Sequence, residues 1–214
     1  MRALLLAALI AAAAPLTPAA AQSAREQALA DLGRADDVAA RRAAAQRLAD
    51  SGAMADLPAL ARALRDPDSL VRAFTESAMW AVWSRSGDAD VDRLFALGVE
   101  QMSQRALDAA TETFSQVIRR RPEFAEGWNK RATVYFLLGD YQKSLADCDE
   151  VMARNPHHWG ALSGYGMIYL QLDQPARALG YFEQALAVNP NLHQVEQTIE
   201  TLKALLIQRR RDMI

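Results

Sequence analysis

The sequence is short of the residue types on which most metal, redox and catalytic sites depend. It has one cysteine and three histidines among 214 residues. A single cysteine excludes an intramolecular disulfide and any zinc or iron–sulfur site with several cysteine ligands. No charge sign dominates either, since 24 basic residues stand against 26 acidic ones. This balance argues against a dedicated nucleic-acid-binding protein, which usually carries a basic excess on one face.

Long apolar runs are absent beyond the first residues of the chain. After a positive start, the stretch Leu4–Ala14 is apolar without interruption. A membrane span needs about 20 apolar residues, so this stretch is too short to cross a bilayer. The short apolar segment and the small residues Ala19–Ala21 are typical of a secretory signal peptide. We expect residues 1–21 to be removed between Ala21 and Gln22; a membrane anchor or a buried helix is the alternative interpretation.

The same features predict where the mature protein resides. No cysteine directly follows the apolar stretch, which excludes a lipid-anchored form. No second long apolar segment follows, so we expect a soluble mature protein without an integral membrane span. The bias toward alanine and arginine is typical of bacteria with GC-rich genomes. Together these features predict secretion across the inner membrane into the periplasm.

One constant interval organises the second half of the chain. Pro122, Pro156 and Pro190 are evenly spaced, and we call the interval between successive prolines the repeat period. Apolar positions recur with helical spacing within each period, so each period is expected to form two helices. Shifting the sequence by one repeat period also aligns three further sets: Phe114, Cys148 and Phe182; Ala110, Ser144 and Ala178; Leu97-Gly98, Arg131-Ala132 and Tyr165-Gly166.

This pattern resembles the tetratricopeptide repeat family, whose motif places Leu-Gly, Tyr, Ala, Phe and Pro at these offsets. The third unit matches best, whereas the second departs from the motif at Arg131, Ser144 and Cys148, and the first has Gln101 in place of an aromatic residue. The resemblance implies an all-α fold, a right-handed α-solenoid of stacked antiparallel helix pairs. The implied repeat domain covers 88–190, with units at 91–124, 125–158 and 159–190.

Local signals agree with helix pairs in these units. Gly139 stands where the first helix of the second unit must end, and Asp140 follows as an N-cap. Asp173-Gln174-Pro175 starts another helix, because proline is tolerated in the first turn. A final helix is predicted from Leu192 to Arg210, within a C-terminal segment 191–214. Its apolar stripe is expected to cap the last unit; a dimer interface is the alternative. The stripe contains Leu192, Val195, Ile199, Leu202 and Leu206.

Residues 22–87 follow a different pattern of helix, acidic turn and helix. One amphipathic helix over 57–64 precedes Asp66-Pro67-Asp68, and a second helix starts at Val71-Arg72. Residues 29–49 echo this order. The pattern resembles HEAT-type repeats, and we expect these helix pairs to stack against the repeat units and extend one core. The best boundary between the two parts is 84–88.

Three features invite a chemical interpretation and are better explained structurally. His157-His158 fall in the turn after Pro156, where a polar turn is the simpler interpretation and a weak surface metal site the alternative. Cys148 takes a position held by phenylalanine in the neighbouring units, so it is expected to be buried rather than a catalytic thiol. The acids of 88–92 suggest a calcium loop, but Arg93 and Val99 stand where such a loop needs glycine and glutamate.

The clusters of glycine, arginine and tryptophan are also better explained by structural roles. Gly160, Gly164 and Gly166 lie on a predicted helix, so they do not form a phosphate-binding loop. The runs 119–121 and 209–211 are arginines that end predicted helices, where cations favour the helix dipole; binding to anionic lipid or an acidic partner is the alternative. Trp80 and Trp83 are expected to pack against Leu94 and Phe95; an exposed aromatic site is the alternative. We therefore predict no catalytic residue, no metal and no cofactor.

The remaining candidate site is the concave surface that the first helices of the units would line. Such a mixed surface suits an extended peptide or an amphipathic helix. Some tetratricopeptide proteins grip a carboxylate with several cations, but only Lys130 is cationic at the matching positions, so that clamp is not carried over. The predicted groove residues are Phe95, Val99, Met102, Asn129, Lys130, Thr133, Phe136, Ser163, Met167 and Leu170.

These observations predict a non-catalytic periplasmic adaptor that holds a protein or peptide partner of unknown identity in the groove, without nucleic acid. The alternative is a structural envelope protein that forms homo-oligomers through the solenoid ends or the C-terminal helix. A third hypothesis is a small enzyme that uses Asp147 and Asp149, but neighbouring residues point to different helix faces.

Overall fold

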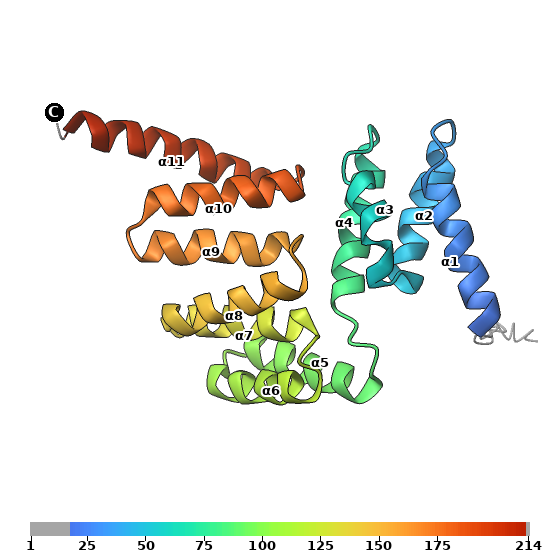
Figure 1. Ribbon diagram of the computed structural model, residues 1–214, viewed down its shortest axis with the longest axis horizontal. Helices are drawn as coiled ribbons and strands as arrows, with labels where there is room; N and C mark the ends of the chain where they lie inside the picture. Colours follow the sequence, from blue (N-terminus) through green and yellow to red (C-terminus); the bar gives the residue numbers. More distant parts are fainter. Residues whose placement is uncertain (1–17, 213–214) are drawn as a thin grey trace, which may run out of the picture.

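The structure, a computed structural model, describes residues 18–212. These residues form eleven α-helices and one short 3-10 helix, with no β-strand among them (Figure 1). The all-helical prediction is therefore confirmed. Most of the predicted signal peptide, residues 1–17, lies outside the described residues, and the division of the chain into domains stays a prediction.

The N-terminal helices form pairs that are held together by arginine–aspartate contacts. The guanidinium of Arg41 is buried and pairs with both carboxylate oxygens of Asp66, at 2.7 and 3.2 Å. Asp68 caps α4 through the backbone N–H of Val71, so the acidic turn that the sequence showed starts this helix. The elements are α1 (Pro18–Leu32), α2 (Val38–Ser51), η1 (Met54–Asp56), α3 (Leu57–Ala63) and α4 (Ser69–Trp83).

The remaining helices pair in the order that the repeat period predicts. The pairs α5–α6, α7–α8 and α9–α10 each form one unit, and α11 follows. The turn inside each unit contains one residue with a positive φ, and these three residues, Arg105, Gly139 and Asp173, are separated by one repeat period each. The predicted N-cap Asp140 is confirmed, and so is the helix start at Asp173-Gln174-Pro175, since α10 begins at Pro175 with Gln174 as its N-cap. The bounds are α5 (Ala89–Ser103), α6 (Leu107–Arg120), α7 (Ala125–Leu137), α8 (Tyr141–Arg154), α9 (Trp159–Gln171), α10 (Pro175–Val188) and α11 (His193–Asp212).

Glycine and phenylalanine fit together inside the first and third units. A Cβ on Gly98 would lie 2.7 Å from the ring of Phe114, and a Cβ on Gly166 would lie 2.6 Å from the ring of Phe182. Both rings are buried, so each glycine lets a second-helix ring approach the first helix closely. In the second unit Ala132 and Cys148 take these positions, and both are buried. The middle unit therefore replaces a glycine–ring pair with two small side chains.

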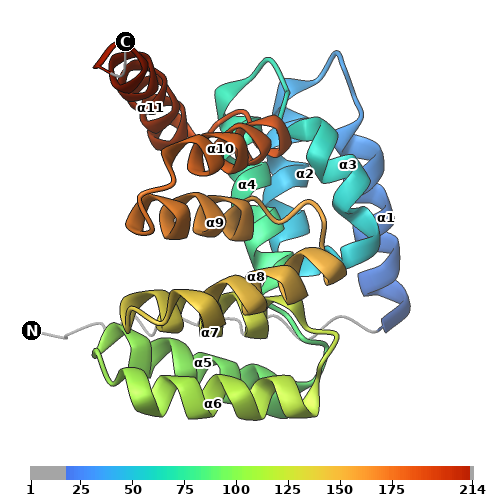
Figure 2. The same cartoon turned by 60° about the vertical axis from the view of Figure 1, so that its left-hand side comes forward.

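Helix α4 runs along the turns that join one repeat unit to the next. The guanidinium of Arg121, in the first of these turns, donates to the carbonyl of Ser86 just after α4, at 2.9 Å. Trp83 stacks on His158 in the second turn, with ring centroids 4.5 Å apart. Arg72 donates to Oδ1 of Asn191 in the third turn, at 2.8 Å. Figures 1 and 2 show α4 beside the ends of the repeat helices.

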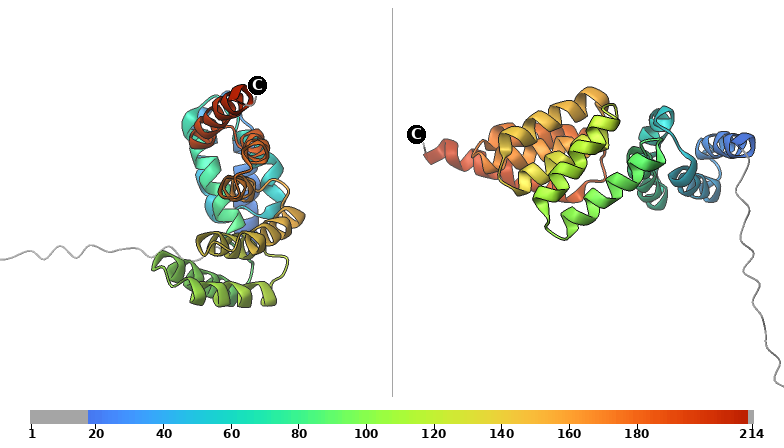
Figure 3. Two further views of the ribbon diagram at one scale, coloured as in Figure 1. Left: turned by 90° about the vertical axis from the view of Figure 1, so that its left-hand side faces the viewer. Right: turned by 90° about the horizontal axis from the view of Figure 1, so that it is seen from below.

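The N-terminal helices therefore pack against one edge of the repeats rather than on the end of the first unit. The core is shared, as expected, because Trp83 clusters with Trp159, Leu162 and Ala185 of the third unit. Figure 3, which includes a view from below, shows the N-terminal helices to one side of the repeat units. The N-terminal helices consequently border both the convex and the concave face of the repeats along this edge.

Helix α11 covers the last unit with only its first half. Ile199 and Leu202 are buried against α10, as the capping prediction requires. The second half extends past α10 (Figure 1), and Leu205 and Ile207 on it are exposed. Arg209 on this half pairs with Asp173, with 2.7 Å between nitrogen and oxygen.

Candidate binding groove

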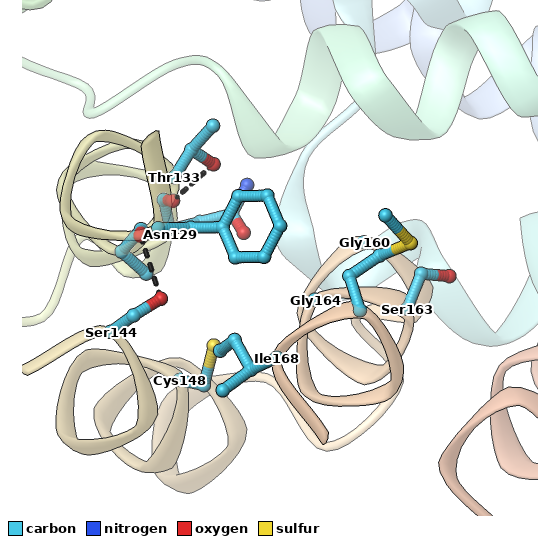
Figure 4. A pocket seen from close by; sticks show the side chains of 11 residues that line it. Asn129, Thr133, Ser144, Cys148, Gly160, Ser163, Gly164 and Ile168 are labelled. Atoms are coloured by element: carbon cyan, nitrogen blue, oxygen red, sulfur yellow. Dashed lines mark hydrogen bonds between the residues drawn. The ribbon is translucent and has the colours of Figure 1, made fainter. Parts of the chain in front are cut away.

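A hollow of about 260 Å³ opens between α7 and α9, with α8 behind it. We call this space the hollow. Figure 4 shows Asn129 and Thr133 on one side of it and Gly160 and Gly164 on the other, with Cys148 between them. Half of the predicted groove residues line the hollow: Asn129, Thr133, Phe136, Ser163 and Met167.

Of the remaining lining residues, only Gly160 and Gly164 were expected near the groove, as small residues at its wall or at a helix contact. These remaining residues are small or buried, which allows the hollow to reach inward between the helices. Two signals could have indicated them: the small residues Gly160 and Gly164 one turn apart on α9, and Cys148 at a position of phenylalanine. These further residues are Ala132, Ser144, Cys148, Gly160, Gly164 and Ile168.

Phe95 is a correction to the predicted groove. Its side chain is only 7% exposed, because its ring packs against Phe114 and Phe124 at centroid distances of 5.8 and 5.3 Å. Val99 and Met102 pack, partly buried, against the same cluster. The first unit therefore uses its predicted groove residues for its own core. Leu170 likewise packs against the core of the third unit.

Lys130 lies beside the hollow but is not a free cation. Its ammonium is 3.1 Å from Oε1 of Glu126 and 5.8 Å from the ring centroid of Trp80. Trp80 itself lies against α9, where a Cβ on Gly160 would approach its ring to 2.8 Å. The chain's own α4 thus closes one end of the concave surface.

The expected packing of the two tryptophans against α5 was wrong. Trp80 and Trp83 contact Trp159 of α9, with ring centroids 5.5 and 4.3 Å apart. Leu94 and Phe95 pack instead within the first unit. The tryptophans belong to the core, as expected, but to its contact with the third unit.

A buried carboxylate connects α7 to the turn before α9. Glu126 has no exposed surface, and its Oε2 lies 2.8 Å from Nε2 of the equally buried His158. The backbone N–H of Ala161 donates to Nδ1 of His158 at 3.1 Å, so the imidazole carries its hydrogen on Nε2 and donates it to Glu126. Asn129 Nδ2 also donates to both carboxylate oxygens, at 3.1 Å.

These donors decide the charge state of Glu126. Burial raises the pKa of its carboxyl, but the hydrogen bond from His158 and the ammonium of Lys130 together lower this pKa by more. The net pKa therefore lies below the ordinary value. Glu126 is therefore an ionised, fully bonded carboxylate. The helix start predicted at His157-His158 is confirmed, since His158 is the N-cap of α9, but its side chain is buried, and nothing in the local sequence marked Glu126 as its partner.

The carboxylates of the enzyme hypothesis do not converge. Asp147 receives two hydrogen bonds of 2.8 Å from Arg131, and Asp149 accepts a hydrogen bond from the hydroxyl of Tyr165. Burial raises the pKa of Asp147 more than Arg131 lowers it. Burial also raises the pKa of the Cys148 thiol to about 12, so the thiol is neutral.

Between Pro18 and Asp212, no group of three or more His, Cys, Asp or Glu side chains is arranged to hold a metal ion. Within the same range, no helix combines the length and the hydropathy needed to cross a bilayer.

Comparison with protein families finds that residues 123–191 match the tetratricopeptide repeat. A TPR repeat-containing protein from Rhizobium etli is 30% identical over 138 residues, which cover 64% of this chain and 67% of that protein. The inactive peptidyl-prolyl cis-trans isomerase FKBP6 of Rattus norvegicus is 34% identical over 107 residues, 47% of this chain but only 32% of FKBP6. The chain thus spans a third or less of some longer relatives.

Three solved structures have a similar fold, and two of them are named as TPR domains. The Sgt2 TPR domain from Aspergillus fumigatus matches 58% of this chain and 83% of that domain, with a TM-score of 0.55 and 19% identity. The first TPR of Spaghetti (RPAP3), bound to an HSP90 peptide, matches 56% of this chain and 96% of its own, with a TM-score of 0.53 and 21% identity. MamA matches 78% of this chain and 82% of its own, with a TM-score of 0.50 and 16% identity. These likenesses show the repeat fold.

Proposed function

This chain belongs to the tetratricopeptide repeat family, and we propose that it is a non-catalytic adaptor that holds a protein or peptide partner in its concave groove. The observation that carries the proposal is the hollow itself. Met167 at its edge is 42% exposed, although it is a large apolar side chain on a first helix. An exposed apolar surface in a concave site is typical of binding sites for partners.

The polar groups of the hollow also suit a polypeptide. Within the described residues, Oδ1 of Asn129 and Oγ of Ser163 make no hydrogen bond. An acceptor and a hydroxyl can pair with the backbone N–H and C=O groups of an extended segment. Two similar domains provide related examples. The first TPR of Spaghetti was solved with an HSP90 peptide, and the TPR2B domain of yeast Sti1 was solved in a complex with pHsp70.

The proposed location of this adaptor is the periplasm. This part of the proposal rests on residues 1–21, whose short apolar stretch and small residues are typical of a signal peptide. A fusion of residues 1–30 to a reporter that is active only after export would test it. Cytoplasmic retention of the reporter would contradict the proposed location without affecting the groove.

Partner capture tests the adaptor role. Tagged protein 22–214 and its Met167→Glu variant would be incubated with periplasmic extract, and the bound proteins identified by mass spectrometry. We expect the variant to lose about tenfold or more of the captured partner, because a carboxylate at the edge of the hollow must be desolvated on binding.

A matched control separates the groove from general surface effects. Leu97 is 45% exposed, as Met167 is at 42%, but it lies on α5 and outside the lining of the hollow. Leu97→Glu should capture the partner as well as the unchanged protein does. Equal capture by all three proteins, with unchanged helical circular dichroism, would exclude the groove as the binding site.

One observation favours the second candidate function, a self-assembling envelope protein. The second half of α11, which extends past α10, exposes Leu205 and Ile207, and the side chain of Ile207 is 55% exposed. Apolar side chains at one end of a solenoid can join copies of the chain. Sedimentation at tens of micromolar decides between the two: a monomer that an Ile207→Asp change leaves unaltered would exclude self-assembly through α11.

A further inference from the structure

The hollow reaches the position at which the units on either side carry a phenylalanine ring. In those units the rings of Phe114 and Phe182 lie against Gly98 and Gly166. The equivalent residues of the middle unit, Cys148 and Ala132, both line the hollow instead. The hollow is therefore present where the middle unit lacks the second-helix ring of its neighbours.

The lining of the hollow favours an aromatic group over a charged one. The sulfur-containing side chains of Cys148 and Met167 and the ring of Phe136 line it. Sulfur and aromatic edges contact aromatic rings favourably. No arginine, lysine, aspartate or glutamate is among the lining residues, and the nearby charges of Lys130 and Glu126 neutralise each other. A charged side chain would lose its hydration here without gaining a partner.

The size of the hollow fits one side chain. A cavity of about 150 Å³ accommodates a benzene ring, whereas pockets for small-molecule ligands measure roughly 300–1,000 Å³. The hollow, at about 260 Å³, lies between these values. It can hold a ring with its methylene group, and it is small for a cofactor.

We propose that the hollow receives one phenylalanine side chain from an extended, locally uncharged segment of the partner polypeptide. This ring lies beside Cys148, the position at which the neighbouring units carry a ring of their own, and the segment's backbone pairs with Asn129 and Ser163. The proposal rests on the proposed adaptor function and adds the chemistry by which the groove selects its partner.

Two variants close the hollow in different ways. The double variant Cys148→Phe with Ala132→Gly restores the ring and the glycine that the neighbouring units use, so the fold should accept it. Gly164→Ala adds one methyl group whose carbon would lie 3.6 Å from Sγ of Cys148, an ordinary contact. Alanine also favours the helix more than glycine does, so this variant should melt at a higher temperature than the unchanged protein.

The probe is N-acetyl-phenylalaninamide, with N-acetyl-glutaminamide as the polar comparison. Protein labelled at methyl groups would be titrated and followed by NMR at Ala132, Met167 and Ile168. We expect these signals to shift with the phenylalanine probe and not with the glutamine probe. The double variant should abolish the shifts, and Gly164→Ala should weaken binding about tenfold, the cost of one misplaced methyl group in an apolar pocket.

Equal shifts with both probes, or unchanged binding to the well-folded Gly164→Ala variant, would overturn the proposal. Partner capture distinguishes this failure from failure of the adaptor function. Capture that Gly164→Ala leaves intact but Met167→Glu removes would keep the groove and reject the phenylalanine anchor. Loss of partner capture in both variants supports the phenylalanine anchor. Unchanged capture by both variants rejects the anchor and the groove.

Discussion

The middle repeat unit differs from its two neighbours in how it fills its interior. The first and third units place Phe114 and Phe182 against glycines, whereas the middle unit has Cys148 against Ala132. In the middle unit alone among the three, an arginine at the Leu-Gly position reaches across to the second helix, where Arg131 binds Asp147. Aromatic packing in the outer units is thus replaced by small side chains and an ion pair.

This difference shows where a repeat protein can place its specificity. The outer units follow the family motif and supply stability through buried rings. The middle unit departs from the motif, and two of its departures, Ser144 and Cys148, line the hollow. Glu126 of the same unit helps to attach α4, because it holds the imidazole on which Trp83 stacks. The residues that match the family least well are therefore the ones that make this chain particular.

The largest expected effect comes from the buried carboxylate of the middle unit. Glu126→Ala should lower the free energy of unfolding by about 3–5 kcal/mol, because it leaves the buried Nε2–H of His158 without an acceptor and opens a cavity. Urea unfolding followed by circular dichroism measures this. Glu126→Gln keeps the shape and an acceptor, so it should cost less; a loss below about 1 kcal/mol in Glu126→Ala would show that the network contributes little.

Acid should remove part of the same contribution. The folded protein holds the pKa of Glu126 below its ordinary value of 4.5, so the stabilisation is complete above that pH and is lost as the pH falls through the folded value. The difference in unfolding free energy between the unchanged protein and Glu126→Gln should therefore shrink as the pH falls below 4.5. A difference that grows below pH 4.5 would contradict a lowered pKa.

The period, helix types and turns of the outer and middle units were predictable because they depend on local sequence. Gly139 and Asp140 mark a helix end and an N-cap through their own local conformational preferences. The groove was half predictable for the same reason, since Met167 is found from its place in the repeat. Phe95 has the place in the first unit that Asn129 and Ser163 have in the other two, but Phe114 and Phe124 enclose it, which the spacing does not reveal.

Contacts between the two kinds of repeat were not predictable from spacing. Trp80 and Trp83 lie outside the part of the chain that follows the repeat period, so no alignment indicates which unit they reach. Glu126 is in the first turn of a helix, where an acid is usually exposed and favoured by the helix dipole. Its burial depends on His158, which is much later in the sequence and lies in the turn that leads to another unit. Only the folded arrangement brings these partners together.

The comparison between the units can be tested by replacing Cys148 and Ala132 of the middle unit with the phenylalanine and glycine that the outer units have at these positions. Cys148→Phe alone should destabilise the protein by about 1–3 kcal/mol, because Ala132 retains the methyl group that glycine lacks in the other units. Adding Ala132→Gly should recover about 1–2 kcal/mol of this in a double-mutant cycle. Additive effects of the two changes would mean that the middle unit packs differently from its neighbours at this position.

The smallest expected effects concern the turns, where the three units adopt one backbone shape with different residues. Gly139 has a φ of 78° and no atom near the position of its missing Cβ, so Gly139→Ala should cost about 1 kcal/mol through backbone strain alone. Arg105 adopts a φ of 60° in the first unit. Arg105→Gly should therefore raise the free energy of unfolding by up to about 0.5 kcal/mol, since relief of strain exceeds the added freedom of the unfolded chain. Chemical denaturation of both variants measures these two changes in the free energy of unfolding. A Gly139→Ala variant that is more stable than the unchanged protein would show that the left-handed turn relaxes in solution.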